Sequence, residues 1–512
     1  MTNKSTYLVR QKLFFITAIL LCLMTLVGIV FITDAAAKDD VVRIYDYCFA
    51  WFGILTYIWC LWSWYKLRKE LLCPYVVFFT VAFVFMFGQS FLTGIGVPIP
   101  RNDLRTMYPP RSILMADVFT VLGLTAFHLG AIALAQDEEA LLERVESKNA
   151  AKTIKAMSST SLYSGTLVAG WVLFLISIVP TVTFSFQRLV LALQYGYSFL
   201  YDPSLVETGL DAVFSRIRLF FPISLICLFI GASDRKFIRM LVFACTVMTV
   251  GVGFLTGGRG QSMVLIITAL CMYHYLVRPI RGMLSVITGI AGVFLLSFVS
   301  IIYKLRNVIG RGLLDYFEAF ISSWGKEGLL VQAISEMGGS MFPLINVMNL
   351  VPRVYSFRYG ESYLYSLFTV IPNVGFWDVH PSAIKANLGN WLQQVLGLSY
   401  GPGFSAVAEA YINFGWAGIA FMFFLGMFYG RIFSLVKYEY DKMKYDPALL
   451  VFVFSVLSLT VMTTRNSFIG TVRAFAYYAI PVYLLCRACA NFVSSRVRGD
   501  FRLSKRETGV SR

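Results

Sequence analysis

The stretch "KFIRMLVFACTVMTVGVGFLTGGRGQSMVLIITALCMYHYLV", residues 236–277, decides the class of fold. It contains two apolar runs of about 20 residues each, the length that an α-helix needs to cross the hydrocarbon core of a bilayer. A glycine-rich break that contains Arg259 separates the two runs. The stretch therefore predicts two membrane-spanning helices joined by a tight turn.

The rest of the chain repeats this pattern. Of the 512 residues, 58% are hydrophobic and 14% are charged, and the mean hydropathy is +0.69. Similar apolar runs predict an all-α polytopic membrane protein with about twelve transmembrane helices. These spans are expected near residues 13–33, 45–64, 71–93, 114–135, 164–185, 218–233, 238–256, 261–277, 283–303, 404–430, 447–464 and 473–493.

Basic residues predict the orientation of these spans. The N-terminal segment carries Lys4, Arg10 and Lys12, and the C-terminal tail is also basic. Because basic loops stay in the cytoplasm, both termini are expected there, with large loops on the outer face. The formal net charge of +16 needs no nucleic acid as a partner, since a basic cytoplasmic collar that faces anionic lipid accounts for most of it.

This topology divides the chain into four parts. They are residues 1–160, which hold helices 1–4 and a charged cytoplasmic connector; 161–303, which hold helices 5–9 and an external loop at 186–217; 304–403, a large external loop; and 404–512, which hold helices 10–12 and a basic cytoplasmic tail. Within the large loop, residues 327–351 and 390–398 predict amphipathic or re-entrant helices.

Arginine is preferred to lysine on the outer face. The external lysines are Lys38, Lys304, Lys326 and Lys385, and all the other basic residues assigned to that face are arginines. A guanidinium forks onto phosphate or carboxylate oxygens, which a topological anchor does not require. We therefore expect an anionic substrate that reaches the protein from outside.

Arg259 is the first candidate for this anion site. Gly257, Gly258 and Gly260 allow a tight reversal, and the free N–H groups of the following helix point at the same spot. The competing interpretation is a snorkelling arginine that only ends the helix.

Other arginines at external span ends are Arg216, Arg218, Arg465 and Arg473. Several guanidiniums at one depth could hold a diphosphate whose lipid stays in the bilayer.

Two residues are candidates for acid or base chemistry. Glu409 lies near the outer end of the span at 404–430, where a carboxylate is either functional or paired with an arginine. His380, beside Asp378 in an external loop, suits proton transfer or a structural hydrogen bond. Glu336 is a weaker candidate of the same kind.

The sequence contains no recognisable motif for metal or nucleotide chemistry. The chain contains neither GxxxxGK[ST] nor HExxH, and Cys486 and Cys489 lie in an apolar helix without a second cysteine pair. We therefore expect no cofactor and no metal site, and we interpret the cysteines as packing residues.

Four segments resemble the Wzy-type polysaccharide polymerases, bacterial inner-membrane enzymes that build O-antigen, enterobacterial common antigen and related exopolysaccharides. They are "RIRLFFPISLICLF" (216–229), "FLTGGRGQSMVLII" (254–267), "GPGFSAVAEAYINFGWAGI" (401–419) and "VMTTRNSFIGTVRAFAYYAIPVYLL" (461–485). The resemblance implies a glycosyltransferase of the GT-C type that joins undecaprenyl-diphosphate-linked oligosaccharides on the periplasmic face, with no metal or nucleotide. A chain-length regulator and a flippase would be its partners.

The resemblance and the chemistry together give a hypothesis for the site. Arg259, Arg465 and either Arg216 or Arg218 would hold the diphosphate, while Glu409 would orient or deprotonate the acceptor hydroxyl. His380 is the alternative base. Because related enzymes do not all have glutamate at the position of Glu409, the resemblance does not require it to be the base.

Two other functions remain open from the sequence. An O-antigen ligase has a similar architecture and relies on an external-loop histidine, a role that His380 could fill; its loss would leave unlinked polymer. A flippase or transporter would carry charges at mid-membrane depth and show repeat symmetry, and its loss would block export of lipid-linked units.

Overall fold

The computed structural model describes residues 3–135, 152–201, 210–232, 235–324, 328–371, 373, 376–439 and 445–507. Over these residues the chain is helical and contains no β-strand. The long helices are α1 (Asn3–Thr33), α2 (Asp39–Arg68), α3 (Pro74–Gly94), α5 (Pro110–Leu134), α7 (Lys152–Tyr195), α9 (Phe220–Gly231), α10 (Lys236–Thr256), α11 (Arg259–Leu276), α12 (Met283–Leu305), α20 (Gly418–Phe433), α21 (Pro447–Thr460) and α23 (Ile480–Glu507). The expected all-α polytopic fold is confirmed.

In the described part of the chain, 11 helical segments are long and apolar enough to cross a membrane, one fewer than the sequence predicts. The difference is the span expected at 261–277, where α11 forms a helix of 18 residues. Its first turn holds Arg259, Gln261 and Ser262, and these polar residues lower its apolar content.

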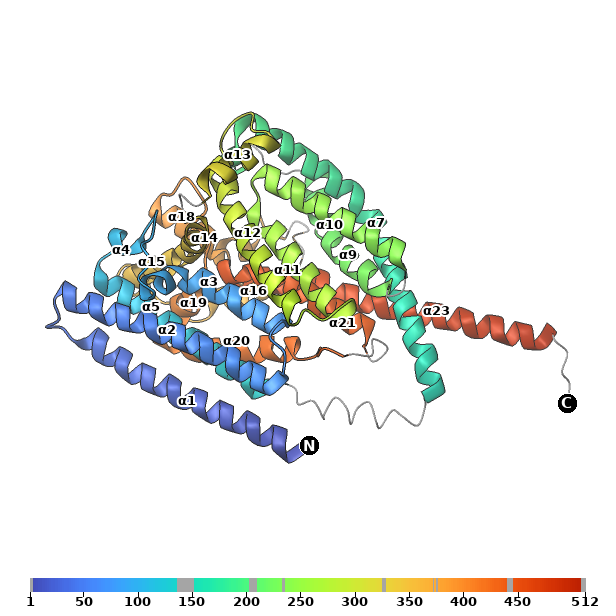
Figure 1. The fold of residues 1–512 in the computed structure, drawn as a ribbon, viewed down its shortest axis with the longest axis horizontal. Helices are drawn as coiled ribbons and strands as arrows, with labels where there is room; N and C mark the ends of the chain where they lie inside the picture. Colours follow the sequence, from blue (N-terminus) through green and yellow to red (C-terminus); the bar gives the residue numbers. More distant parts are fainter. Residues whose placement is uncertain are drawn as a thin grey trace.

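The helices pack as two neighbouring groups that α21 connects (Figure 1). In one group α5 is almost completely buried and packs against α1, α2 and α20. In the other, α7 packs along α9 and α23. By contrast, most of α1 and α10 is exposed through apolar side chains such as Phe15, Leu26, Phe243 and Met248, as expected for surfaces that face lipid.

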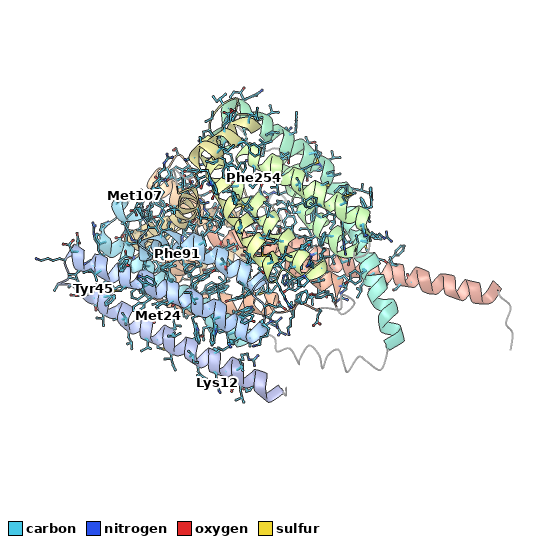
Figure 2. The ribbon with its side chains drawn as sticks, in the orientation of Figure 1. Lys12, Met24, Tyr45, Phe91, Met107 and Phe254 are labelled. Atoms are coloured by element: carbon cyan, nitrogen blue, oxygen red, sulfur yellow. The ribbon has the colours of Figure 1, made fainter. Side chains whose placement is uncertain are left out.

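Residues assigned to opposite faces of the membrane lie at different edges of the molecule. Figure 2 shows Lys12 at its lower edge, and Tyr45 and Met107 toward its left edge. Lys12 belongs to the basic N-terminal segment, whereas Met107 belongs to an expected external loop. The short helices α4 (Leu104–Met107) and α18 (Leu388–Leu396) lie toward the end that carries Met107 (Figure 1).

The large loop that is predicted to be external, residues 304–403, consists mainly of short helices. They are α13 (Leu313–Ser323), α14 (Leu329–Gly338), the 3₁₀ turn η3 (Gly339–Met341), α15 (Phe342–Leu350), α16 (Glu361–Phe368), α17 (Pro381–Lys385) and α18. Helices α14 and α15 lie within residues 327–351, and α18 overlaps residues 390–398, where the sequence predicts amphipathic or re-entrant helices. The loop expected from residue 186 begins later, because residues 186–195 continue α7. Most of the predicted cytoplasmic connector, residues 136–151, lies outside the described residues.

Candidate active site

The tight reversal expected at the glycine-rich break is present. Gly257 ends α10 in the left-handed conformation, with φ of +90°, and Arg259 is the first residue of α11. A Cβ atom on Gly257 would lie 2.9 Å from the Cβ of Arg306 and 3.0 Å from the ring of Tyr197. Glycine is therefore needed here for the backbone turn and for the close approach of two other segments.

Arg259 lies against a carboxylate and an aromatic ring. Its Nη1 donates to Oε2 of Glu336 at 2.5 Å, and its guanidinium carbon lies 4.5 Å from the centre of the Tyr303 ring. The second carboxylate oxygen of Glu336, Oε1, is buried without a hydrogen-bond partner. Burial raises the pKa of Glu336, and the positive charge of Arg259 opposes this shift. Arg259 is thus the binding partner of a half-buried acid rather than an isolated helix end.

Arg306 joins this group, which sequence reasoning missed. Its guanidinium lies over two tyrosine rings, 4.2 Å from the centre of Tyr303 and 4.9 Å from that of Tyr197. Burial and the like charge of Arg259 lower the pKa of Arg306. The only available signal is the position of Arg306 directly after the apolar run of α12.

Close packing of α14 on α3 places Glu336. A Cβ atom on Gly338 would lie 2.2 Å from the backbone nitrogen of Gln89, so only glycine allows this approach. The side chain of Gln89 then donates to the carbonyl of Ser335 at 3.1 Å. The "SEMGGS" segment therefore has a structural reason for its glycine, and Glu336 lies two residues from this contact.

Glu409 lies on a helix that is shorter than expected. The span predicted at 404–430 divides at Gly415, with φ of +57°, into α19 (Ala406–Phe414) and α20, with the 3₁₀ turn η4 (Gly415–Ala417) between them. Glu409 is 1% exposed. Its Oε1 accepts from the hydroxyl of Ser362 in α16 at 2.7 Å, and its Oε2 accepts from the backbone N–H of Phe468 at 2.6 Å. Asn413 also donates to Ser362, at 2.8 Å. Glu409 thus connects three separate segments of the chain.

A small cavity lies beside Glu409. Its lining includes Tyr363, Met422, Thr464 and Asn466, and its volume is about 30 Å³. This volume is enough for about two water molecules. It does not hold a sugar ring, so in this conformation the carboxylate of Glu409 does not face a substrate-sized space.

Arg465 ends the 3₁₀ turn η6 (Val461–Arg465). This turn contacts both α19, which carries Glu409, and α11, which carries Arg259. The carbonyl of Arg465 accepts from the N–H of Phe404 at 3.1 Å, close to the start of α19, and its guanidinium lies 5.9 Å from the ring of Phe85 in α3. On the other side, η6 packs against the first turn of α11, where a Cβ atom on Gly260 would lie 2.8 Å from Met462. The structure therefore places the Arg465 and Arg259 elements next to each other.

Arg216, Arg218 and Arg473 form a separate group around Tyr478. All three interact electrostatically with Tyr478, and Arg216 and Arg473 also interact with each other. They come from the end of α8 (Leu210–Ile217), the residue after it, and α22 (Ile469–Arg473). Arg473 donates to the hydroxyl of Thr369 at 3.0 Å, directly after α16. The sequence instead predicts that Arg216 or Arg218 lies with Arg259 and Arg465. In the structure, α16 connects the group around Tyr478 with Glu409.

Hydrogen bonds occupy both ring nitrogens of His380. Its Nδ1 accepts from the N–H of Ser382 at 3.1 Å and caps the short helix α17, while Nε2 donates to the carbonyl of Ile371 at 2.9 Å. The ring also packs edge-on against Trp377 at 5.0 Å. The observed contacts are those of a loop histidine with a structural role.

Sequence reasoning also missed an ion cluster in the first third of the chain. Arg105 donates to Asp46 at 2.9 Å and to Asp117 at 3.0 Å, and Ser90 donates to Asp117 at 2.5 Å. These residues join the loop that carries Arg105 to α2, α3 and α5. In the part of the chain that the structure describes, no group of three or more His, Cys, Asp and Glu side chains is arranged to hold a metal ion.

These features define a polytopic α-helical membrane protein whose arginines gather at the ends of membrane helices. The family model described as O-antigen polysaccharide polymerase Wzy matches residues 12–496, so the chain belongs to this family. Its activity is the polymerisation of lipid-linked repeat units in the membrane. Comparison with curated proteins and with solved structures finds no match.

Proposed function

We propose that the protein polymerises undecaprenyl-diphosphate-linked oligosaccharides on the periplasmic face of the bacterial inner membrane without a metal ion. In this proposal α11 also crosses the membrane, so both termini lie in the cytoplasm. A flippase that delivers the lipid-linked units and a regulator of chain length would be its partners. The observation that carries this proposal is the gathering of arginines from separate elements around α14, α16 and η6, at the ends of membrane helices.

The diphosphate linkage already activates the donor sugar, so the protein must chiefly neutralise the negative charge that develops on the leaving diphosphate. The bond between the anomeric carbon of the growing chain and the diphosphate oxygen breaks, and the electron pair leaves with the diphosphate. The acceptor hydroxyl attacks the anomeric carbon and gives its proton to a base. Guanidiniums that bind the departing diphosphate stabilise the charge that develops on it. Arg259 and Arg465 are proposed for this role, and Arg216, Arg218 and Arg473 are proposed to bind phosphate oxygens from their separate group around Tyr478.

Glu409 is proposed as a positioning residue. Its carboxylate accepts hydrogen bonds from Ser362 and from the backbone of Phe468, and the adjacent cavity has room only for water. It therefore holds α16 against the segment between Arg465 and Arg473, and so aligns the arginines. A water in the cavity could still carry the acceptor proton to Glu409, and His380 is the alternative base.

Replacement of Arg259 tests this function in cells. A deletion strain would be complemented with wild type, Arg259→Ala, Arg259→Lys and the control Arg353→Ala, which removes an exposed arginine of the large external loop. At equal membrane abundance, both Arg259 variants should reduce the polysaccharide ladder to single repeat units, because a lysine ammonium cannot replace the guanidinium fork. Arg353→Ala should keep the ladder. An unchanged ladder in both Arg259 variants would refute the proposed role of this arginine.

A further inference from the structure

We infer that Arg306 and Arg259 together form the binding site for a prenyl diphosphate, with Glu336 as the counter-ion that occupies the site when it is empty. The inference rests on the proposed function for the identity of the substrate. It adds Arg306 as a binding residue. It also assigns Glu336, an acid among arginines, the role of a competitor of the ligand.

The surroundings of Arg306 leave its hydrogen-bond donors available to an anion. Its half-buried guanidinium lies over the rings of Tyr303 and Tyr197, but within the described chain no oxygen accepts a hydrogen bond from it. A guanidinium has five N–H donors in a planar fork. Stacking on aromatic faces satisfies none of them and leaves the edge of the fork open to a ligand.

The balance of charge supports the same conclusion. Glu336 is the carboxylate that Arg259 binds, and it also interacts electrostatically with Arg306 and with the exposed Arg101. One negative charge therefore faces three positive charges. Oε1 of Glu336 is buried without a hydrogen-bond partner, so the carboxylate does not complete the group. An anion with several oxygens would complete it better than a single carboxylate does.

The location suits a diphosphate that remains attached to a lipid. The turn between α10 and α11, the end of α12 and helix α14 meet at this point, where Gly257 lies against Arg306. Below the turn, α10 and α12 expose apolar side chains, including Val247, Met248, Ile290 and Phe294. A prenyl chain could lie along these helices in the bilayer while its diphosphate reaches both guanidiniums.

Glu336 would compete with the diphosphate for the guanidinium of Arg259, because both are anions that bind the same donor. Each phosphate group of the ligand would take one guanidinium fork, so the Nη1 donor of Arg259 would leave Glu336 for a phosphate oxygen. The carboxylate competes with the ligand in the empty site and balances the arginines until the ligand arrives. Its removal should therefore strengthen diphosphate binding, whereas removal of either arginine should weaken it.

The test measures binding by the full-length protein in nanodiscs of uncharged phospholipid. Isothermal titration would compare farnesyl diphosphate, farnesol and inorganic diphosphate on wild type, Arg259→Ala, Arg306→Ala, Glu336→Gln and the control Arg353→Ala. We expect each of the two arginine variants to lower the affinity for farnesyl diphosphate by about ten- to a hundred-fold, the loss of a charge-assisted hydrogen-bonded pair. Glu336→Gln should raise this affinity, and Arg353→Ala should leave it unchanged. Thermal melting of each variant would show that it is folded.

Three results would overturn the inference. Wild-type affinity in a folded Arg306→Ala variant would remove Arg306 from the site. A lower affinity in Glu336→Gln would show that Glu336 orients Arg259 instead of competing with the ligand. Equal affinities for inorganic and farnesyl diphosphate would show that the site does not select a lipid-linked ligand. The proposed function would survive the first two results if Arg259→Ala still abolished the polysaccharide ladder, so the two proposals fail separately.

Discussion

Two ion clusters of this protein have opposite compositions. In the first, one guanidinium, that of Arg105, binds two carboxylates, those of Asp46 and Asp117. In the second, two guanidiniums, those of Arg259 and Arg306, lie around one carboxylate, that of Glu336. The first cluster has more acid than base, and the second has more base than acid.

The arginines of the two clusters respond to burial differently. Burial alone would lower the pKa of Arg105, but Asp46 and Asp117 raise it above its ordinary value. Burial also lowers the pKa of Arg306, and the like charge of Arg259 lowers it further. A cation that its neighbours stabilise holds a fold together, whereas a cation that its neighbours repel favours the arrival of an anion. At Arg306 the neighbouring Tyr303, Tyr197 and Glu336 partly offset the lowering of the pKa. We therefore expect a structural role for the first cluster, and we propose a binding role for the second.

The largest expected effect is on the structural cluster. Asp117→Ala would leave Arg105 without its buried partner on α5, where the Asp117 side chain is 0% exposed. Breaking a buried ion pair in this way costs about 3–5 kcal/mol. We expect little folded protein in the membrane, measured as monodisperse material on size-exclusion chromatography after detergent extraction. Asp40→Ala, which removes an exposed acid at the start of α2, is the control and should behave as wild type. Normal folding of Asp117→Ala would show that the cluster does not hold the loop in place.

A smaller effect is expected at Glu409, a carboxylate to which two neutral groups donate. Glu409→Ala removes the acceptor for Ser362 and for the N–H of Phe468, at a cost of about 1–3 kcal/mol. It should lower the melting temperature and abolish polymerisation. Glu409→Gln keeps the shape and one of the two acceptors, so it should retain part of the polymerisation rate. If the Gln variant melts as wild type does and yet is as inactive as the Ala variant, Glu409 is the base and not a positioning residue.

The smallest effect is expected at His380, which interacts with neither cluster through a hydrogen bond or ion pair in the described structure. His380→Asn keeps a side-chain acceptor that can cap α17, a contribution of about 1 kcal/mol or less. The polysaccharide ladder should be unchanged on a gel that resolves repeat units. A ladder reduced to single repeat units would make His380 the base. Accumulation of polymer that is not attached to its acceptor would indicate the chemistry of a ligase.

The sequence predicts the parts of this molecule that local composition controls. Apolar runs locate the membrane helices, and the glycines around Arg259 predict the turn. The four Wzy-like segments also lead to the correct family. The sequence predicts one span more than the 11 candidates in the described residues, because α11 combines a polar first turn with an apolar body. The break at Gly415 was not predicted, because an apolar run does not show where a helix divides.

Partnerships between distant residues could not be predicted from the sequence. Arg259 and Glu336 are 77 residues apart, and Arg105 and Asp46 are 59 apart. Their contacts depend on how helices pack, for example on the approach of Gly338 to Gln89, which no local pattern reveals. For the same reason Arg306 resembles an ordinary anchor at the end of a span until the tertiary structure places Arg259 beside it.

Polymerisation by the purified protein tests the central claim most directly, namely that the arginine-rich cluster serves catalysis and not folding. Full-length protein in nanodiscs would be incubated with lipid-linked repeat units, and the products would be separated by length on a gel. Wild type and Arg353→Ala should produce a ladder, whereas Arg259→Ala should leave single units while remaining folded at the assay temperature. A ladder of wild-type length and rate from Arg259→Ala would contradict the account, and so would a loss of activity that only accompanies unfolding.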